Sequence, residues 1–569
     1  MKKILLILAV TFSTASYAQH NISFEINSGI EEMQSNPSGL IEIGNQLVSI
    51  ETTFGNNFNQ SDLKVFDKNY GTLLFSEILS NSFDDYFSII EAVEIDESSN
   101  YIFAINKSGF DSNTGEQTNS SLLYRYNSDG LILENTLSNI QTSILIYNSG
   151  DLLFIDATNL NINKLNMTDY SILETTSISF ENTDFATPKI FKLNDNNFLI
   201  KGNINTGNNN NDVFLSKFDL NAQILWENVI NGNRNDYINA VTSINDEIYL
   251  CGKSLSYDGI FADQYGDGID MGDEPFKSNW IMKLSTNGDL IWNKLLNPSW
   301  YQQQNGQFFD IYNGNSFIIV SGSSYNNYDF HPTYDNVYNQ DIFSVKFDLE
   351  GSVIWEKTYG GFNNQIFNSM GISNDQIIYT TNLNRWNFLG VGGGFSSQGD
   401  VTAEENGKFE NPLSNENQND IWVFATNFDG EIQWNQLYGG EKNDGVYYSI
   451  YNSEAIYNNA FTQSSGYDVG ELIGNQDSWL FKLIADGSAA GVDDQNQLDI
   501  SIYPNPSSDM VYIDGNYTQL KVVVYDILGK QVMNKAITNH IDISQLEKGV
   551  YILQLSDGVK LTTQRILKN

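Results

Sequence analysis

An acidic segment in the middle of the chain has residue types and spacing close to those of a calcium site. Asp263, Asp267 and Glu274 stand at the first, fifth and twelfth positions of an EF-hand-like loop, and Gly268 fills the sixth. Calcium prefers such carboxylate oxygens as ligands. The third position, normally acidic, is Tyr265, and no flanking helical pattern is present. The segment predicts either a calcium site at Asp263, Asp267 and Glu274 or a solvated acidic loop, and no other cofactor is expected.

Residues for other kinds of catalysis are sparse. The three histidines, His20, His331 and His540, are far apart, and neither an HExxH nor a CxxC motif occurs, which argues against a histidine-rich zinc site. His331 is the one histidine that a catalytic triad in the body could use, but no GxSxG motif accompanies it. We therefore interpret the chain as a non-catalytic binding protein. A carboxylate-based carbohydrate-active enzyme and a purely structural surface protein are the alternatives.

The cysteine content and the charge limit the possible disulfides and binding partners of the chain. Cys251 is the only cysteine, so no intramolecular disulfide can form, and its apolar surroundings predict a buried structural thiol. Residues 499–569 hold seven acidic and seven basic side chains, so the rest of the chain carries the whole net charge of −41. An acidic body repels phosphate backbones, and nucleic acid is therefore not an expected partner.

These residues are carried by a unit that recurs between residues 60 and 487. Its pattern is an aspartate, an aromatic residue, a lysine, a glycine five residues later and a tryptophan four residues after that. The clear copies end at Trp226, Trp292, Trp355 and Trp434, and the first of them has Ala222 in place of the glycine. Weaker copies cover residues 62–75, 120–134 and 161–174, and a last copy begins at Asp477 and stops after Gly487.

Each unit predicts four β-strands, because alternating apolar runs are separated by glycine and asparagine turns and no helical period appears. Four-stranded units repeated in this way indicate an all-β chain with a β-propeller of eight blades, or seven if residues 161–174 form no blade. The recurrent tryptophans should pack one blade on the next. We expect the ring to close by pairing the last strand, residues 477–483, with strands at residues 22–26, 39–43 and 46–50.

Three long insertions interrupt successive units just before the lysine strand. They cover residues 255–277, 323–340 and 387–419. Because they fall at the same point of each unit, they should emerge on one face of the ring. Long loops on a rigid scaffold are where binding usually resides. We therefore expect this face to bind an extracellular glycan or protein.

The last seventy residues form a separate segment, in which short apolar runs between turn signals predict a small Ig-like β-sandwich. Its motifs are Tyr503-Pro504-Asn505-Pro506 at the start, Gly529-Lys530 in the middle, and Gly549 and Tyr551 near the end. The segment resembles the type A C-terminal sorting domain of type IX secretion cargo. The resemblance implies recognition by that secretion machinery and removal of the domain at the cell surface. An ordinary Ig-like accessory domain is the alternative.

The N-terminus agrees with export. Lys2 and Lys3 precede the apolar run 4–10, and small residues follow up to Ala18, which predicts a signal peptide cleaved after Ala18. No later stretch is long and apolar enough to span a membrane. The predicted organisation is a signal peptide (1–18), a propeller (19–486), a linker (487–498) and a sorting domain (499–569). The protein should pass through the periplasm and outer membrane to the cell surface or the medium.

Overall fold

The structure is a computed structural model, and the residues that it describes are 22–29, 33–55, 59–82, 84–96, 100–110, 114, 116–127, 130–181, 185–205, 211–256, 258–264, 278–296, 307–314, 316–324, 340–360, 364–384, 419–440, 442–466, 468–484, 500–503, 507–515, 520–526, 531–537, 539–546, 548–556 and 561–568. The chain divides into two compact units, Met1–Gly487 and Ser488–Asn569.

The described part of the first unit forms eight four-stranded antiparallel sheets. We number them in chain order. Sheets 1 to 4 are β2 (Gln34–Ile43), β3 (Gln46–Phe54), β4 (Asn59–Asp67) and β5 (Leu73–Ser80); β6 (Tyr86–Asp96), β7 (Asn100–Phe110), β8 (Gln117–Asn127) and β9 (Gly130–Ser138); β10 (Thr142–Asn148), β11 (Asp151–Asp156), β12 (Asn161–Leu165) and β13 (Ile172–Ser177); β14 (Phe185–Lys192), β15 (Phe198–Asn205), β16 (Asn211–Phe218) and β17 (Ile224–Ile230).

Sheets 5 to 8 continue the series, and sheet 8 takes its fourth strand from the N-terminal part of the chain. They are β18 (Asp236–Ile244), β19 (Glu247–Ser254), β20 (Ser278–Leu284) and β21 (Leu290–Leu296); β22 (Gln307–Asn313), β23 (Phe317–Ser324), β24 (Asp341–Asp348) and β25 (Val353–Tyr359); β26 (Asn364–Ser373), β27 (Gln376–Asn384), β28 (Asn419–Thr426) and β29 (Ile432–Tyr438); β30 (Asp444–Tyr451), β31 (Ala455–Thr462), β32 (Asp477–Ile484) and β1 (Ile22–Ser28).

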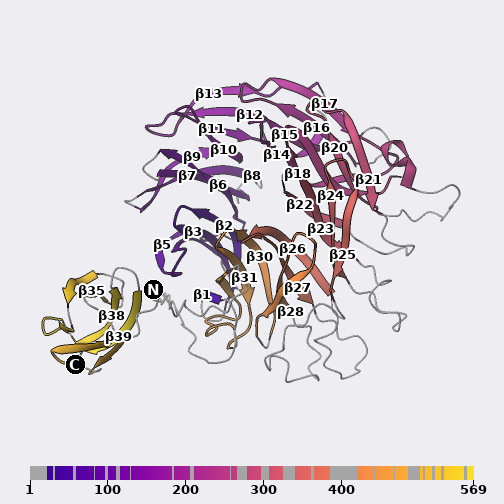
Figure 1. Cartoon of the computed structure of the whole chain (residues 1–569). Coiled ribbons are helices and arrows are strands. Elements are labelled where there is room, and N and C mark those ends of the chain that lie inside the picture. The colour runs from indigo at the N-terminus through magenta and orange to yellow at the C-terminus, as the bar shows by residue number, and fades with distance from the viewer. Residues whose placement is uncertain are drawn as a thin grey trace. The chain divides into compact units, whose positions relative to one another are not determined.

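The sheets form a closed ring, which is the predicted eight-bladed β-propeller. In sheets 1 to 7 the strands lie side by side in chain order. Every sheet contacts the next one, mostly through the first strands, and β30 of sheet 8 contacts β2 of sheet 1. The first strands therefore make up the hub of the ring, and the fourth strands lie at its rim, as β13, β17 and β21 do in Figure 1.

Ring closure is confirmed, but the predicted composition of the last blade is wrong in part. β1 pairs with β32, from Ile22 opposite Leu483 to Ser28 opposite Ser478. Residues 39–43 and 46–50, however, pair with each other and with β4 in sheet 1. The sequence repeat is out of phase with the blades, because the lysine and tryptophan strands are the third and fourth strands of a sheet. Sheet 8 thus needs only one strand from the N-terminal part.

The repeated tryptophan and glycine form one packing device between neighbouring sheets. The indole of Trp292 in sheet 5 donates to the Leu349 carbonyl in the turn between β24 and β25 of sheet 6, at 3.1 Å. Gly351 ends that turn at φ +86°, and a Cβ there would lie 2.8 Å from the Trp292 ring. Trp226 meets Gly288 in the same way. The motif glycine therefore both supplies a left-handed turn and makes room for an indole.

The motif lysine lies on the third strand and is largely buried. Lys283 and Lys346 donate to the carbonyls of Leu349 and Phe428 in the next sheet, the same carbonyls that accept from Trp292 and Trp355. Each lysine thus donates a hydrogen bond to a turn carbonyl. A buried carbonyl without a hydrogen bond would cost free energy of folding. This device explains why lysine and tryptophan recur together in the sequence.

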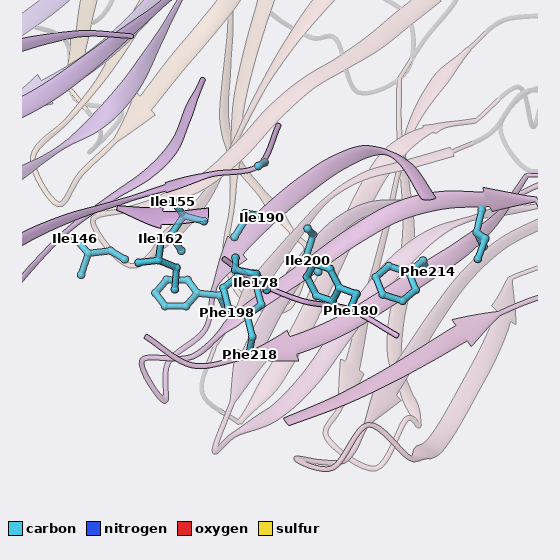
Figure 2. Close-up of a cluster of buried hydrophobic side chains, with 12 residues drawn as sticks. Ile146, Ile155, Ile162, Ile178, Phe180, Ile190, Phe198, Ile200, Phe214 and Phe218 are labelled. Atoms are coloured by element: carbon cyan, nitrogen blue, oxygen red, sulfur yellow. The ribbon is translucent and has the colours of Figure 1, made fainter. Parts of the chain in front are cut away.

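The contact between sheets 3 and 4 is built differently. Sheet 3 has no tryptophan, and its junction with sheet 4 is filled by isoleucines and phenylalanines (Figure 2). Phe180 lies between the two sheets, with its ring centroid 5.4 Å from that of Phe185 and 5.6 Å from that of Phe214, both in edge-to-face geometry. Such edge-to-face pairs contribute beyond simple area burial.

The second unit contains two small sheets around one core. One sheet has the order β33 (Ile500–Tyr503), β34 (Met510–Gly515) and β37 (His540–Asp542). The other has the order β36 (Gln531–Ile537), β35 (Leu520–Asp526), β38 (Gly549–Ser556) and β39 (Leu561–Lys568). Alternating apolar side chains of both sheets, such as Val511 and Leu553, are fully buried, which gives the predicted β-sandwich.

Candidate binding face and hub

The three predicted insertions join the second strand to the third strand in three consecutive sheets. They connect β19 to β20, β23 to β24 and β27 to β28. We call the side of the ring on which second strands end and third strands begin the loop face. The strand ends that carry the insertions therefore share the loop face, as expected. The insertions themselves lie outside the described residues, except for 255–256, 258–264 with the 3-10 helix η1 (Gly259–Gln264), 323–324, Gln340 and Asn419.

An aspartate follows the motif tryptophan by ten residues, as Asp236 follows Trp226 and Asp444 follows Trp434, and it has a structural function at the loop face. Asp236 begins β18, and its carboxylate accepts from Ser254 Oγ at 2.5 Å and from Ser256 Oγ at 3.0 Å. Asp444 begins β30 and accepts from Thr462 Oγ1 at 2.5 Å and Ser464 Oγ at 2.7 Å. Each aspartate thus ties the start of the first strand to the end of the second strand.

Both aspartates are fully buried, and a second acid lies near each. Burial first, and then the nearby carboxylates of Asp212 and Asp258, raise the pKa of Asp236 to about 7, against the lowering effect of the two serine hydrogen bonds. Burial likewise raises the pKa of Asp444 to about 6. A Cβ on Gly439 would lie 2.6 Å from an oxygen of Asp420 and 2.7 Å from an oxygen of Asp444, which explains the glycine there.

A ring of backbone irregularities marks the hub. In all eight sheets the register between first and second strand shifts, so that residues of the first strand bulge out of the pairing. The bulged residues are Ser38, Glu91–Ala92, Ile95, Ser143, Thr187–Pro188, Asn239, Phe309, Asn368 and Tyr447. Ile95 is buried, and the others with a described side chain are half-buried or exposed. Bulges re-aim side chains, and here most of the bulged residues are polar.

Several bulges are held by a polar side chain from the second strand of the preceding sheet. Asn382 on β27 donates to the Val446 carbonyl at 3.2 Å and accepts from the Val446 N–H at 2.8 Å, beside the bulge of β30. Asn106 on β7 makes the same two bonds to Thr142 on β10, at 2.7 and 2.9 Å. Satisfying both backbone groups fixes the strand next to the bulge. We call these side chains the asparagine clamps.

The sequence did not predict the bulges that line the hub. The bulges depend on pairing register, which composition does not reveal. A usable signal was Tyr447-Tyr448 in a strand where alternation should bury one of two neighbours. Both rings are exposed, at 47% and 39%.

The predicted calcium ligands remain untested by the structure. Asp263 lies in η1, and its side chain is not among the described ones, whereas Asp267 and Glu274 fall outside the described residues. Among the described residues no group of three or more His, Cys, Asp or Glu side chains could hold a metal ion.

The structure also gives the surroundings of the cysteine and of one of the three histidines. Cys251 is fully buried on β19, and burial raises the pKa of its thiol. His540 is exposed on β37, while His20 and His331 lie outside the described residues. No helix in the described part of the chain is long and apolar enough to cross a membrane.

In the second unit the sorting-signal residues fall at the ends of strands. Tyr503 closes β33 and is exposed, and its ring stacks on that of Tyr512 at 6.0 Å. Gly549 opens β38, where Tyr551 is buried in the core. Pro504, Asn505, Pro506, Gly529 and Lys530 lie outside the described residues, as do Ala18 and the linker 487–498.

Comparison with known families identifies the second unit. Residues 501–569 match the secretion system C-terminal sorting domain. This is the sorting domain of the type IX system, so the protein interacts with that machinery and is secreted across the outer membrane to the surface or the medium. No curated protein matches the chain.

Solved structures with partial likeness to the chain include propellers. The β-propeller domain of the Trilobed protease from Pyrococcus furiosus is 8% identical, covering 70% of this chain and 93% of that chain with a TM-score of 0.36. A protein of unknown function from Bacteroides caccae is 12% identical, covering 51% of this chain and 93% of that chain with a TM-score of 0.24. The fold assignment rests on the strand pairing of this chain rather than on these low scores.

Proposed function

We propose that the exported propeller is a non-catalytic module that binds an extracellular glycan or protein through its loop face. The observation that carries the proposal is the placement of three long connections on three consecutive sheets, all at the loop face. Long loops presented by rigid strands are suited to recognition. The strands that frame them, such as β24 and β28, are almost entirely buried.

The acids of the loop face support binding rather than catalysis. A catalytic carboxylate must reach a substrate. Asp236 and Asp444 have raised pKa values of about 7 and about 6, which would suit a general acid. Both, however, are fully buried and already bonded to two hydroxyl groups each. Their perturbed pKa values therefore follow from a structural arrangement.

The test is a binding panel with the full chain. Polysaccharides and surface extracts are scored for retention, and the polysaccharides also for new reducing ends. Replacing residues 387–416 with a short Gly-Ser linker should weaken binding and leave thermal unfolding unchanged. This replacement spares Asn419, whose N–H donates to Asn443 at 3.0 Å. The matched control replaces residues 206–210, the short connection at the same point of sheet 4.

Two outcomes would contradict the proposal. Reducing ends that disappear when one carboxylate pair is changed would establish a carbohydrate-active enzyme. Failure to bind any polysaccharide or surface protein would favour a purely structural role.

A further inference from the structure

The bulge of β30 leaves two neighbouring tyrosines exposed. In a regular strand, successive side chains point to opposite faces, and one of two neighbours on an inner strand becomes buried. The register of β30 shifts between Val446 and Tyr448, with Tyr447 as the extra residue. Tyr447 is 47% exposed and Tyr448 39% exposed, although both neighbouring strands, β26 and β2, contact β30.

Each of the two consecutive tyrosines is partly supported by its surroundings. The pKa of Tyr448 is raised first by partial burial and then by its neighbour Tyr447. The Tyr447 ring lies 5.6 Å from that of Phe461, a tilted contact that supports it from behind. The result is a pair of adjacent, partly supported aromatic rings at the hub.

Polar groups hold this pair in place. The clamp Asn382 bonds both backbone groups of Val446, directly before the bulge. Asn368, the bulged residue of sheet 7, donates to the carbonyls of Val446 at 3.2 Å and Tyr447 at 3.4 Å. Ser369 and Tyr451 share a hydrogen bond of 2.8 Å beside them. The rings are therefore presented by a fixed backbone, which lowers the entropy lost on binding.

We propose that Tyr447 and Tyr448 form a stacking platform at the hub for the sugar rings of an uncharged polysaccharide. Tyrosines offer rigid apolar faces with hydroxyl edges, and neighbouring amide and hydroxyl groups suit hydroxylated ligands. The net charge of −41 disfavours polyanionic chains, which selects the uncharged class. The inference rests on the proposed binding function and names the ligand class and the residues that contact it.

The experiment uses the full chain with dextran, mannan, galactan and a mixed-linkage β-glucan as probes, and polygalacturonate as the charged counterpart. Affinity electrophoresis measures binding. For the probe that binds, Tyr447→Ala and Tyr448→Ala should each weaken affinity about tenfold or more, as removal of an aromatic anchor does. Tyr447→Phe and Tyr448→Phe retain the ring and should stay within about threefold. Tyr70→Ala is the control, because Tyr70 is 55% exposed in the turn between β4 and β5, away from the hub.

A second pair of variants tests Asn382 as a positioning residue. Asn382→Ala should weaken binding of the same probe, because the bulge of β30 loses both bonds that fix it. Asn106→Ala removes the equivalent clamp from β10 and should leave probe affinity unchanged. Asn106 also accepts from Ser121 Oγ at 3.0 Å, so the melting temperature of Asn106→Ala should fall at least as far as that of Asn382→Ala. A difference in affinity between them therefore reports on position rather than on general stability.

The possible results separate the inference from the proposed function. The inference is overturned if the alanine variants of both tyrosines keep full affinity, if only polygalacturonate binds, or if none of the probes binds. Retained affinity in those variants with loss on replacing residues 387–416 would leave the proposed function standing and move the site to the loops. Binding of surface proteins alone would do the same.

Discussion

The junction between sheets 3 and 4 differs from those between sheets 4, 5, 6 and 7 in two linked ways. In the later junctions a tryptophan of one sheet packs on a glycine of the next, as Trp226 does on Gly288. Sheet 3 has Glu174 opposite Lys164, where sheet 4 has Trp226 opposite Lys217. The turn of sheet 4 that would receive the missing indole has Ala222, not glycine, at φ +61°.

This comparison shows what the motif glycine is for. A left-handed turn alone tolerates alanine, as Ala222 demonstrates, so positive φ does not by itself require glycine here. In sheets 5, 6 and 7 the turn has a glycine, and an indole from the preceding sheet lies against it. Where the indole is absent, the phenylalanine cluster around Phe180 fills the junction instead (Figure 2). One chain thus uses two solutions to the same packing problem.

The largest expected loss of stability comes from the phenylalanine cluster between sheets 3 and 4. Phe180→Ala should lower the free energy of unfolding by about 3–5 kcal/mol, because it removes a buried ring with three aromatic neighbours and leaves a cavity. Chemical denaturation of the full chain measures the change. Leu173→Ala, in the outer strand of sheet 3 and 60% exposed, should stay within about 0.5 kcal/mol. Equal effects of the two variants would show that Phe180 does not join the sheets.

The next largest loss of stability should come from a tryptophan–glycine contact between two sheets. Gly351→Ala should destabilise by about 2–4 kcal/mol, because left-handed strain adds to a methyl group 2.8 Å from the Trp292 ring. The matched control is Gly150→Ala, at φ +89° with nothing within 4 Å of its Cβ. The control should lose only about 1–2 kcal/mol. If both variants lost the same amount, the glycine would serve the turn alone.

The junctions also differ in charge, and this predicts a pH dependence. Asp236 and Asp444 lie at junctions 4/5 and 7/8, and their folded pKa values of about 7 and about 6 exceed the ordinary value of 3.8. The folded chain therefore keeps protons that the unfolded chain has released, so stability falls as pH rises from about 4 to about 7. Each group contributes at most about 1.4 kcal/mol per pH unit in its window.

The measurement compares melting temperature against pH for the wild type and the double variant Asp236→Asn, Asp444→Asn. The amide resembles the protonated acid, so the variant should keep its stability at pH 7.5 and show a flatter profile. The difference between the two profiles removes the contribution of the other acids. Parallel profiles would mean that these two carboxylates are charged in the folded chain at neutral pH.

The sequence carries the parts of this fold that repeat. The spacing of lysine, glycine and tryptophan predicts the hairpins and the ring, because Trp226, Trp292 and Trp355 each donate to a turn carbonyl of the next sheet. It does not reveal the phase of the blades, since a hairpin of third and fourth strands looks like one of first and second strands. The bulge at Tyr447 and the clamp at Asn382 escape prediction because both depend on which residues face each other across strands. The constant spacing of Asp236 and Asp444 from the motif tryptophan can be read in the sequence, but the spacing does not show which hydroxyl groups they bond.

The smallest expected effects come from introducing a tryptophan–glycine contact at the junction between sheets 3 and 4. Ala222→Gly removes left-handed strain of about 1–2 kcal/mol but loosens the unfolded chain by about 0.4–1 kcal/mol, so the net gain should be about 1 kcal/mol or less. Glu174→Trp alone should be neutral or destabilising, because the new indole would meet the Ala222 methyl group. When Glu174→Trp is combined with Ala222→Gly, the new indole can pack on the glycine as Trp226 packs on Gly288. A double-mutant cycle read by denaturation should give a favourable coupling of about 0.5 kcal/mol or more. Strict additivity would show that indole and glycine do not depend on each other at this junction.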